Sequence, residues 1–119
     1  MSNSVLLNFM MNTVMVDLNQ RVIEYFDKLT NYILSVSKDY DEIKFYVNKK
    51  TKEEVSLNYY IHYCLRIEVL ATFYEHKIDI TKIEDEYIQK FVEIFYKRYY
   101  NEFYKKIMSF NCGKKINFY

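Results

Sequence analysis

Proline and tryptophan are absent from this chain of 119 residues, and glycine and alanine occur once each, as Gly113 and Ala71. Proline and glycine are the strongest helix breakers, so their scarcity favours long, uninterrupted helices. A phosphate-binding loop needs glycines for close approach of the backbone to the ligand, and a single glycine cannot build one. The composition therefore favours an all-α protein and argues against nucleotide-binding α/β folds.

Cysteine and histidine are also scarce, with two of each. Cys64 and Cys112 are too few for a disulfide scaffold and indicate free thiols in a reducing compartment. His62 and Cys64 are two residues apart, so they point in nearly opposite directions on a helix. The usual metal spacings, such as Cys-x-x-Cys and His-Glu-x-x-His, do not occur. We therefore expect no metal, no cofactor, no catalytic residue and no small-molecule substrate, which means that the protein is not an enzyme.

Neither sign of charge dominates, because the formal net charge is +1. The first 16 residues carry no charged side chain, but Asn8, Asn12 and Thr13 interrupt an apolar stretch that is shorter than the ~20 residues of a membrane span. No basic residues precede the stretch, as they would in a signal peptide. We expect no membrane span and a cytoplasmic location, in a bacterium or in an infected host cell.

Tyrosine, phenylalanine, lysine and asparagine are the abundant residues, with 14 tyrosines and 9 phenylalanines. Lysine, asparagine, isoleucine, tyrosine and phenylalanine are encoded by A/T-rich codons, whereas glycine, alanine and proline need G/C-rich ones. This bias indicates an AT-rich genome, that of a bacterium, a plasmid or a virus. It does not indicate a reaction.

Hydrophobic periodicity predicts one domain over residues 1–119, with helices near 17–36, 41–49, 52–77 and 82–112. The uncharged segment 1–16 is a separate short helix, a kinked extension or an extended strand. Segment 41–49 could instead be a strand that pairs with 54–58. Two long helices joined by a short link predict an antiparallel hairpin. The predicted fold is a small antiparallel bundle of three to five helices, dominated by this long C-terminal hairpin.

Helix 52–77 is predicted to start at a capping pair, Thr51 and Glu54, and helix 82–112 at a similar pair, Thr81 and Glu84. The predicted core face of helix 52–77 comprises Tyr59, Tyr60, Tyr63, Cys64, Ile67, Leu70, Ala71 and Tyr74. A second apolar row lies off this face, so the helix is apolar nearly all round. Such a helix is either central in its own fold or covered by a second chain.

Two apolar surfaces form the candidate interface with another protein. The first is the N-terminal segment and the second is the off-face row of helix 52–77, with the candidate residues Leu6, Leu7, Met10, Met11, Ile61, Leu65, Val69 and Phe73. Exposed apolar patches of this size usually mark protein contacts. Our first hypothesis is a non-enzymatic interaction or assembly protein that binds another protein or its own copy as a homo-oligomer. The two surfaces could also cover each other within one chain.

The C-terminal part of the chain is basic and rich in tyrosine. Residues 86–119 contain seven basic and three acidic side chains, a balance of +4. The candidate binding surface here comprises Tyr96, Lys97, Arg98, Tyr100, Tyr104, Lys105 and Lys106. Cations could hold phosphates while partly exposed tyrosines stack on bases, so nucleic-acid binding is the alternative function. A solvated helix face with cations near its negative dipole end would give the same pattern.

The chain also resembles the short viral Bcl-2-like proteins in its length near 120 residues, its apolar central helix and its AT-rich composition. It lacks the Asn-Trp-Gly-Arg signature of that family, since it has no tryptophan and no glycine before position 113. The resemblance implies a protein that binds a host protein. It transfers no site residue to this chain.

Overall fold

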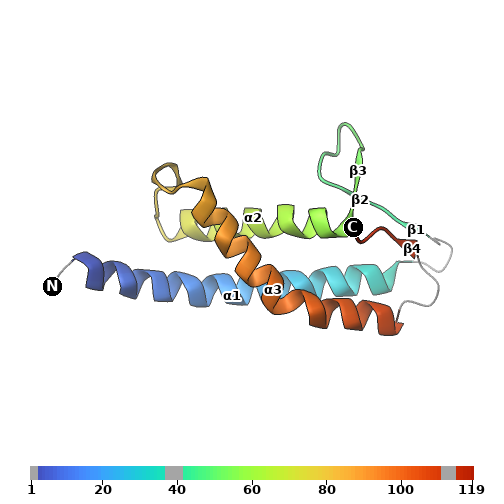
Figure 1. The fold of residues 1–119 in the computed structure, drawn as a ribbon, viewed down its shortest axis with the longest axis horizontal. Coiled ribbons are helices and arrows are strands. Elements are labelled where there is room, and N and C mark those ends of the chain that lie inside the picture. The colour runs from blue at the N-terminus through green and yellow to red at the C-terminus, as the bar shows by residue number, and fades with distance from the viewer. Residues whose placement is uncertain (1–2, 37–41, 111–114) are drawn as a thin grey trace.

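The computed structural model describes residues 3–36, 42–110 and 115–119 (Figure 1). Most of these residues are helical, which confirms the predicted predominance of α-structure. The helices are α1 (Asn3–Ser35), α2 (Leu57–Glu75) and α3 (Asp85–Phe110), together with the 3-10 helix η1 (Ile80–Lys82). Four two-residue strands accompany them: β1 (Glu42–Ile43), β2 (Phe45–Tyr46), β3 (Glu54–Val55) and β4 (Lys115–Ile116).

The first helix, α1, runs without a break for 33 residues, through the segment that we expected to be separate, kinked or extended. Its buried side chains recur at helical spacing, at Val14, Leu18, Val22, Phe26, Leu29 and Ile33. Val14 lies one turn before Leu18, so the buried face of this helix continues toward the N-terminus beyond the predicted start at residue 17. No proline or glycine interrupts the backbone hydrogen bonds.

Residues 42–46 form two short strands, so the helix predicted for 41–49 is wrong. Ile43 and Phe45 are buried while Glu42, Lys44 and Tyr46 are exposed, which is the period of two of a strand. The alternative prediction is correct in outline, because β2 pairs antiparallel with β3. Strand β1 pairs in parallel with β4, from the far end of the chain.

The second helix, α2, begins at Leu57, five residues after the predicted start, and does not use the Thr51–Glu54 pair. Ser56 is the N-cap instead, and its hydroxyl oxygen accepts a hydrogen bond from the Tyr59 amide at 3.1 Å. Serine is among the best N-cap residues. This cap satisfies the Tyr59 amide but not the first two amides of the helix.

Residues 115–119 supply the hydrogen-bond acceptors for these two amides. The amides of Leu57 and Asn58 donate hydrogen bonds to the carbonyl oxygens of Asn117, at 2.6 Å, and Phe118, at 3.0 Å. The first amides of a helix have no acceptor within the helix. The C-terminal segment therefore completes the cap of a helix that lies in the middle of the sequence.

The third helix, α3, begins at Asp85, later than predicted, because η1 precedes it. Thr81 belongs to η1, where its amide donates to the Asp79 side chain at 3.0 Å, and it does not cap α3. Helical spacing in the sequence puts Ile88, Phe91, Val92, Phe95, Tyr99, Phe103, Ile107 and Phe110 on one core stripe. Of these, Ile88, Val92, Phe95, Phe103 and Ile107 are buried. The predicted end of the helix at Cys112 and Gly113 lies outside the described residues.

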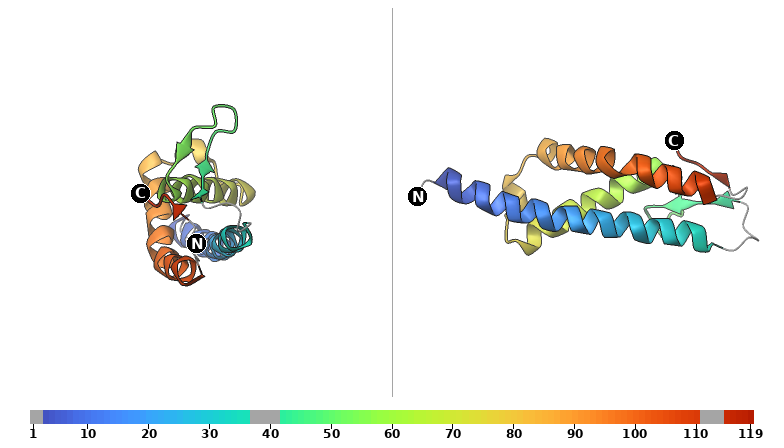
Figure 2. Two further views of the ribbon diagram at one scale, coloured as in Figure 1. Left: turned by 90° about the vertical axis from the view of Figure 1, so that its right-hand side faces the viewer. Right: turned by 90° about the horizontal axis from the view of Figure 1, so that it is seen from below.

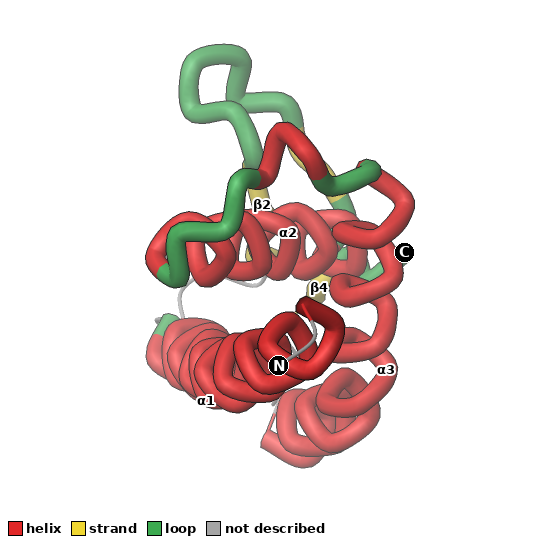
Figure 3. The backbone as a smooth tube through the Cα atoms, turned by 90° about the vertical axis from the view of Figure 1, so that its left-hand side faces the viewer, coloured by secondary structure: helices red, strands yellow, loops and turns green. Residues whose placement is uncertain are grey.

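All three helices pack against one another (Figure 3). Figure 3 looks along the bundle, with α1 and α2 side by side and α3 along one flank. The core lies between them and joins side chains of all three helices with Ile43 and Phe45. The predicted dominance of a C-terminal hairpin is not confirmed, because α1 is the longest described helix and α3 crosses α2 obliquely in Figure 1.

The molecule is elongated, with extents of 60 × 31 × 20 Å and a radius of gyration of 16.8 Å. A compact domain of this length would have a radius of gyration of about 13.5 Å. The N-terminal part of α1 extends past the neighbouring ends of α2 and α3, as Figure 1 and the right-hand view of Figure 2 both show. None of the described helices has an apolar stretch long enough to cross a bilayer.

Candidate functional site

The tyrosine ladder of α3, formed by Tyr96, Tyr100 and Tyr104, is mostly covered. Tyr100 is 9% exposed, and the other two rings are half-buried. The Tyr96 and Tyr100 rings stack with centroids 4.7 Å apart, and Tyr104 follows 6.0 Å from Tyr100. Burial raises the pKa of Tyr100. The prediction that all three rings are partly exposed is therefore wrong at Tyr100, the middle of the ladder.

Two groups from outside α3 cover the ladder. The imidazole of His62, on α2, lies on the Tyr96 ring with centroids 4.1 Å apart. Phe118 packs edge-on against Tyr104, with centroids 5.2 Å apart and planes at 68°. Both contacts are long-range in sequence. A ladder that these groups occupy cannot also present three free faces for base stacking.

The cations of the predicted basic surface do lie outside. Lys97, Arg98, Lys105 and Lys106 are all exposed. The Arg98 guanidinium lies 5.1 Å from the centre of the Phe95 ring and donates to Asn19 Oδ1 at 3.2 Å, so it also joins α3 to α1. The structure therefore separates the cations, which are accessible, from most of the aromatic surface, which is not.

The candidate interface row of α2 is core. Ile61, Leu65 and Val69 are fully buried, and Phe73 is 1% exposed. This half of the predicted apolar interface is therefore wrong for a partner that meets the folded monomer. The reason is that helix periodicity identifies two apolar rows on α2 without showing which row faces α1 and α3.

Most of the face that we predicted to be core lies outside instead. Of its eight residues, Tyr60, Cys64 and Ala71 are half-buried. The other five form what we call the outer row of α2, which comprises Tyr59, Tyr63, Ile67, Leu70 and Tyr74. At 100° per residue these five positions fall within 80° of one another, on the side opposite the buried row. Four of them are 41–75% exposed and Leu70 is half-buried. The outer row contains no charged side chain along the whole length of α2.

The N-terminal candidates Leu6, Leu7, Met10 and Met11 belong to α1 by backbone, and their side chains lie outside the described residues. The first described side chains after them include exposed Asn12 and Thr13 and buried Val14. Val16 is also exposed. The buried face of α1, as far as it is described, thus begins at Val14.

Sequence reasoning missed a polar contact between α1 and α2. His76 Nε2 lies 2.9 Å from Asp17 Oδ2, and Arg21 contacts both Asp17 and Glu75. The hydrogen bond from His76, followed by the charge of Arg21, lowers the pKa of Asp17 despite some desolvation. Asp17 and Arg21 are one turn apart in the sequence, but nothing in the pattern indicates that His76, 59 residues later, lies opposite them.

The nucleophile and metal chemistry of the described residues is sparse. Burial raises the pKa of the Cys64 thiol, although the Tyr25 and Tyr60 hydroxyls partly oppose this, so the thiol stays protonated near neutral pH. In the described ranges, no three His, Cys, Asp or Glu side chains gather as metal ligands would. Arg66, one turn after His62 on α2, forms an ion pair with Asp85.

No family model matches this chain. The comparisons with curated proteins and with solved structures also give no match. The candidate surfaces must therefore be judged from their own geometry.

Proposed function

We propose that the protein acts by binding another protein, in the first instance a second copy of itself, through the outer row of α2. The observation that carries this proposal is the uncharged row of aromatic and aliphatic side chains that the described part of the fold leaves uncovered. In a monomer these apolar side chains face water, and a continuous exposed apolar row usually marks a protein contact.

The size of the row fits the centre of an interface. A fully buried aromatic side chain removes about 150–250 Å² from water, so the three half-exposed tyrosines of the outer row offer about 300 Å². A stable interface needs about 800 Å² from each partner, so flanking residues must add to it. Tyrosine is also enriched at the centres of interfaces and charged side chains are depleted there. The N-terminal extension of α1, uncharged in sequence, is the second surface that we propose for protein contact.

The test compares two isoleucines of similar exposure. Ile67 in the outer row is 49% exposed, and Ile94 on α3 is 45% exposed. We expect Ile67→Glu to abolish concentration-dependent association in sedimentation velocity, because it places a charge at the centre of the interface. Ile94→Glu should sediment as the unchanged protein does. Circular dichroism on both variants checks that the helices persist.

The result that overturns the proposal is equal behaviour of the two variants. If the unchanged protein is monomeric at every concentration, the same pair is compared in pull-downs from the native host. Proteins that bind the unchanged chain and Ile94→Glu, but not Ile67→Glu, would support a different partner at the same row. Identical capture by both variants would reject the outer row as the interface.

Nucleic-acid binding through α3 is a second candidate, and the exposed cations Lys97, Lys105 and Lys106 favour it. Contacts would be mainly to phosphates, since Tyr100 is buried. Phosphate binding weakens steeply with salt, whereas apolar protein contacts do not. Anisotropy titrations of labelled DNA at two salt concentrations, with the Lys97→Glu/Arg98→Glu/Lys105→Glu variant beside the unchanged protein, separate the two functions.

A further inference from the structure

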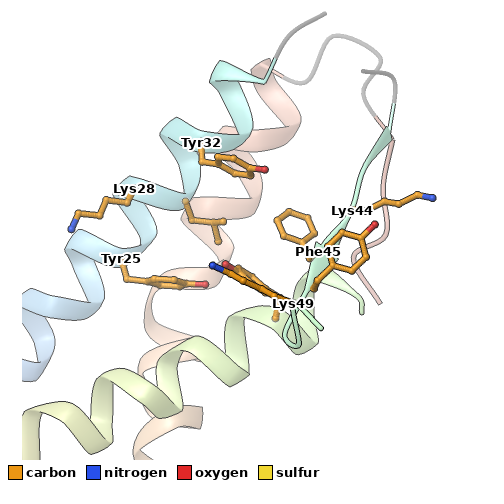
Figure 4. A pocket seen from close by; sticks show the side chains of 9 residues that line it. Tyr25, Lys28, Tyr32, Lys44, Phe45 and Lys49 are labelled. Carbon is orange, nitrogen blue, oxygen red and sulfur yellow. The ribbon is translucent and has the colours of Figure 1, made fainter. Parts of the chain in front are cut away.

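A cavity of about 380 Å³ lies between α1, α2 and the β2–β3 hairpin (Figure 4). Among the described residues, five aromatic rings, three lysines and one leucine line it, and no carboxylate does. Ligand pockets are typically about 300–1,000 Å³ and are lined by apolar and aromatic side chains with a few polar groups. The size and lining are those of a site for a small molecule.

The walls of the cavity are aromatic. Phe45 is buried and packs against Tyr60 with ring centroids 5.1 Å apart, while Tyr25 forms the α1 side. Tyr32 and Tyr46 are exposed and stand at its edge. Figure 4 shows the Tyr25 and Tyr32 rings reaching from α1 toward the Phe45 side. Aromatic faces favour a planar ring between them over a flexible aliphatic chain.

The charge in the cavity comes from the hairpin. In Figure 4 the Lys49 ammonium reaches toward Tyr25, whereas Lys28 and Lys44 point outward. Lys44 lies 4.0 Å from Glu42, but among the described residues Lys28 and Lys49 form no ion pair. A lysine ammonium beside an aromatic lining, with no carboxylate among the described residues that line the cavity, could bind an anion.

Lys49 belongs to a hairpin turn that hydrogen bonds from Asn48 stabilise. Asn48 Oδ1 accepts hydrogen bonds from the amides of Lys50, at 2.9 Å, and Thr51, at 3.4 Å. Asn48 O accepts a third from the Lys52 amide at 3.1 Å, and Lys52 has φ 51°. Lys49 and Lys50 are both exposed, but only Lys49 lines the cavity.

The floor carries a buried polar group. The hydroxyl oxygen of Tyr25 has no nitrogen or oxygen partner among the described residues, although it lies beside the weakly accepting Cys64 thiol. Buried hydroxyls are nearly always hydrogen-bonded, and a ligand in the cavity could supply a stronger acceptor than sulfur. Desolvation raises the pKa of Tyr25, and the group stays a neutral donor.

We propose that this cavity binds a planar aromatic molecule that carries one anionic group, phosphate or carboxylate. The ring lies among Tyr25, Tyr32, Phe45 and Tyr60, and the anion meets the Lys49 ammonium. The site shares no residue with the outer row of α2, so it stands independently of the proposed protein interface.

The test uses 1-naphthyl phosphate as the ligand, with 1-naphthol and inorganic phosphate as the two halves of its chemistry. We expect saturable binding of 1-naphthyl phosphate by isothermal titration calorimetry, and much weaker binding of either half. Lys49→Gln should weaken the binding of 1-naphthyl phosphate about tenfold, which is the effect of losing one charge-assisted hydrogen bond. Lys50→Gln, one position along the same turn, should change it less than about twofold.

A second pair of variants tests the aromatic wall. Tyr32 and Tyr87 are both 55% exposed, but only Tyr32 lines the cavity. Tyr32→Ala should weaken the binding of 1-naphthyl phosphate several-fold, and Tyr87→Ala should leave it unchanged. Absence of saturable binding to the unchanged protein, equal affinity for 1-naphthol, or equal effects of Lys49→Gln and Lys50→Gln would each overturn the proposal.

Discussion

Tyr59 and Tyr63 on α2 are one helical turn apart, as are Tyr96 and Tyr100 on α3. The α2 pair is exposed, while on α3 Tyr100 is buried and Tyr96 half-covered. The two pairs consist of the same residue type, and they differ in which other parts of the chain pack against them. The α3 row receives His62 and the C-terminal segment 115–119, whereas no described segment lies over the α2 row. A helix with two apolar rows thus becomes half core and half surface through contacts that are distant in sequence.

The largest expected effect tests the two sides of α2 with one residue type. Ile61 is fully buried and Ile67 is 49% exposed. Ile61→Ala should lower the free energy of unfolding by about 2–5 kcal/mol, because it removes buried methyl groups and leaves a cavity. Ile67→Ala should change it by about 0.5 kcal/mol or less. Urea unfolding followed by circular dichroism measures both, at a protein concentration low enough for the chain to be monomeric.

If Ile61→Ala does not fold, Ile61→Val and Ile67→Val keep the comparison open. The buried change should still cost about 0.5–1.5 kcal/mol, and the exposed change close to nothing. Equal losses at the two positions in the monomer would show that another part of the chain covers the outer row, and would contradict the difference that the structure gives between the two faces.

A smaller effect concerns the cover of the α3 ladder. Phe118→Ala removes the ring that packs edge-on against Tyr104, and should lower the free energy of unfolding by about 1–2 kcal/mol. Tyr74→Ala, in the exposed row of α2, is the control and should cost about 0.5 kcal/mol or less. A Phe118→Ala variant as stable as the unchanged protein would mean that segment 115–119 does not hold the ladder.

The smallest effect is the pH dependence of the contact between Asp17 and His76. The hydrogen bond from His76 holds the pKa of Asp17 below its usual 3.8. A carboxyl with a lowered pKa adds stability that is present above the unfolded value and is lost as the pH falls through the folded value. Because Asp17 is partly exposed, the gain is small.

Urea unfolding at about pH 5 and about pH 3 measures this loss. The fall in stability between the two should be smaller in Asp17→Asn than in the unchanged protein. Glu24→Gln, an exposed carboxylate on the same helix, serves as the control. The same fall in all three proteins would remove the Asp17–His76 contact from the forces that hold α1 against α2.

Local patterns predicted the interior of α1 and α3 well. The spacing of Leu18, Val22 and Phe26, and of Val92 and Phe95, is enough to identify their buried faces, because each helix has one clear apolar side. The strands at 42–46 were also visible in principle, since exposed and buried residues alternate there. A short segment of five residues, however, fits a helix and a strand almost equally.

The candidate sites were harder to predict, for a physical reason. On α2 both rows are apolar, so periodicity does not tell Ile61 from Ile67. The cavity depends on Lys49 in a hairpin turn, Tyr25 on α1 and Tyr60 on α2, which come together only in the folded chain. Ser56, the true N-cap of α2, lies beyond a Thr51–Glu54 pair with better spacing, and the carbonyls that favour the later start come from residues 117 and 118.

That last contact has a consequence for how the protein is made. Translation proceeds from the N-terminus, so Leu57 and Asn58 leave the ribosome sixty residues before the carbonyls of Asn117 and Phe118 are synthesised. Strand β1 likewise cannot form its pairing with β4 until Lys115 and Ile116 have been synthesised. On the nascent chain, the start of α2 therefore lacks these two acceptors, and the Tyr104 ring lacks its contact with Phe118, until residues 115–119 have been synthesised.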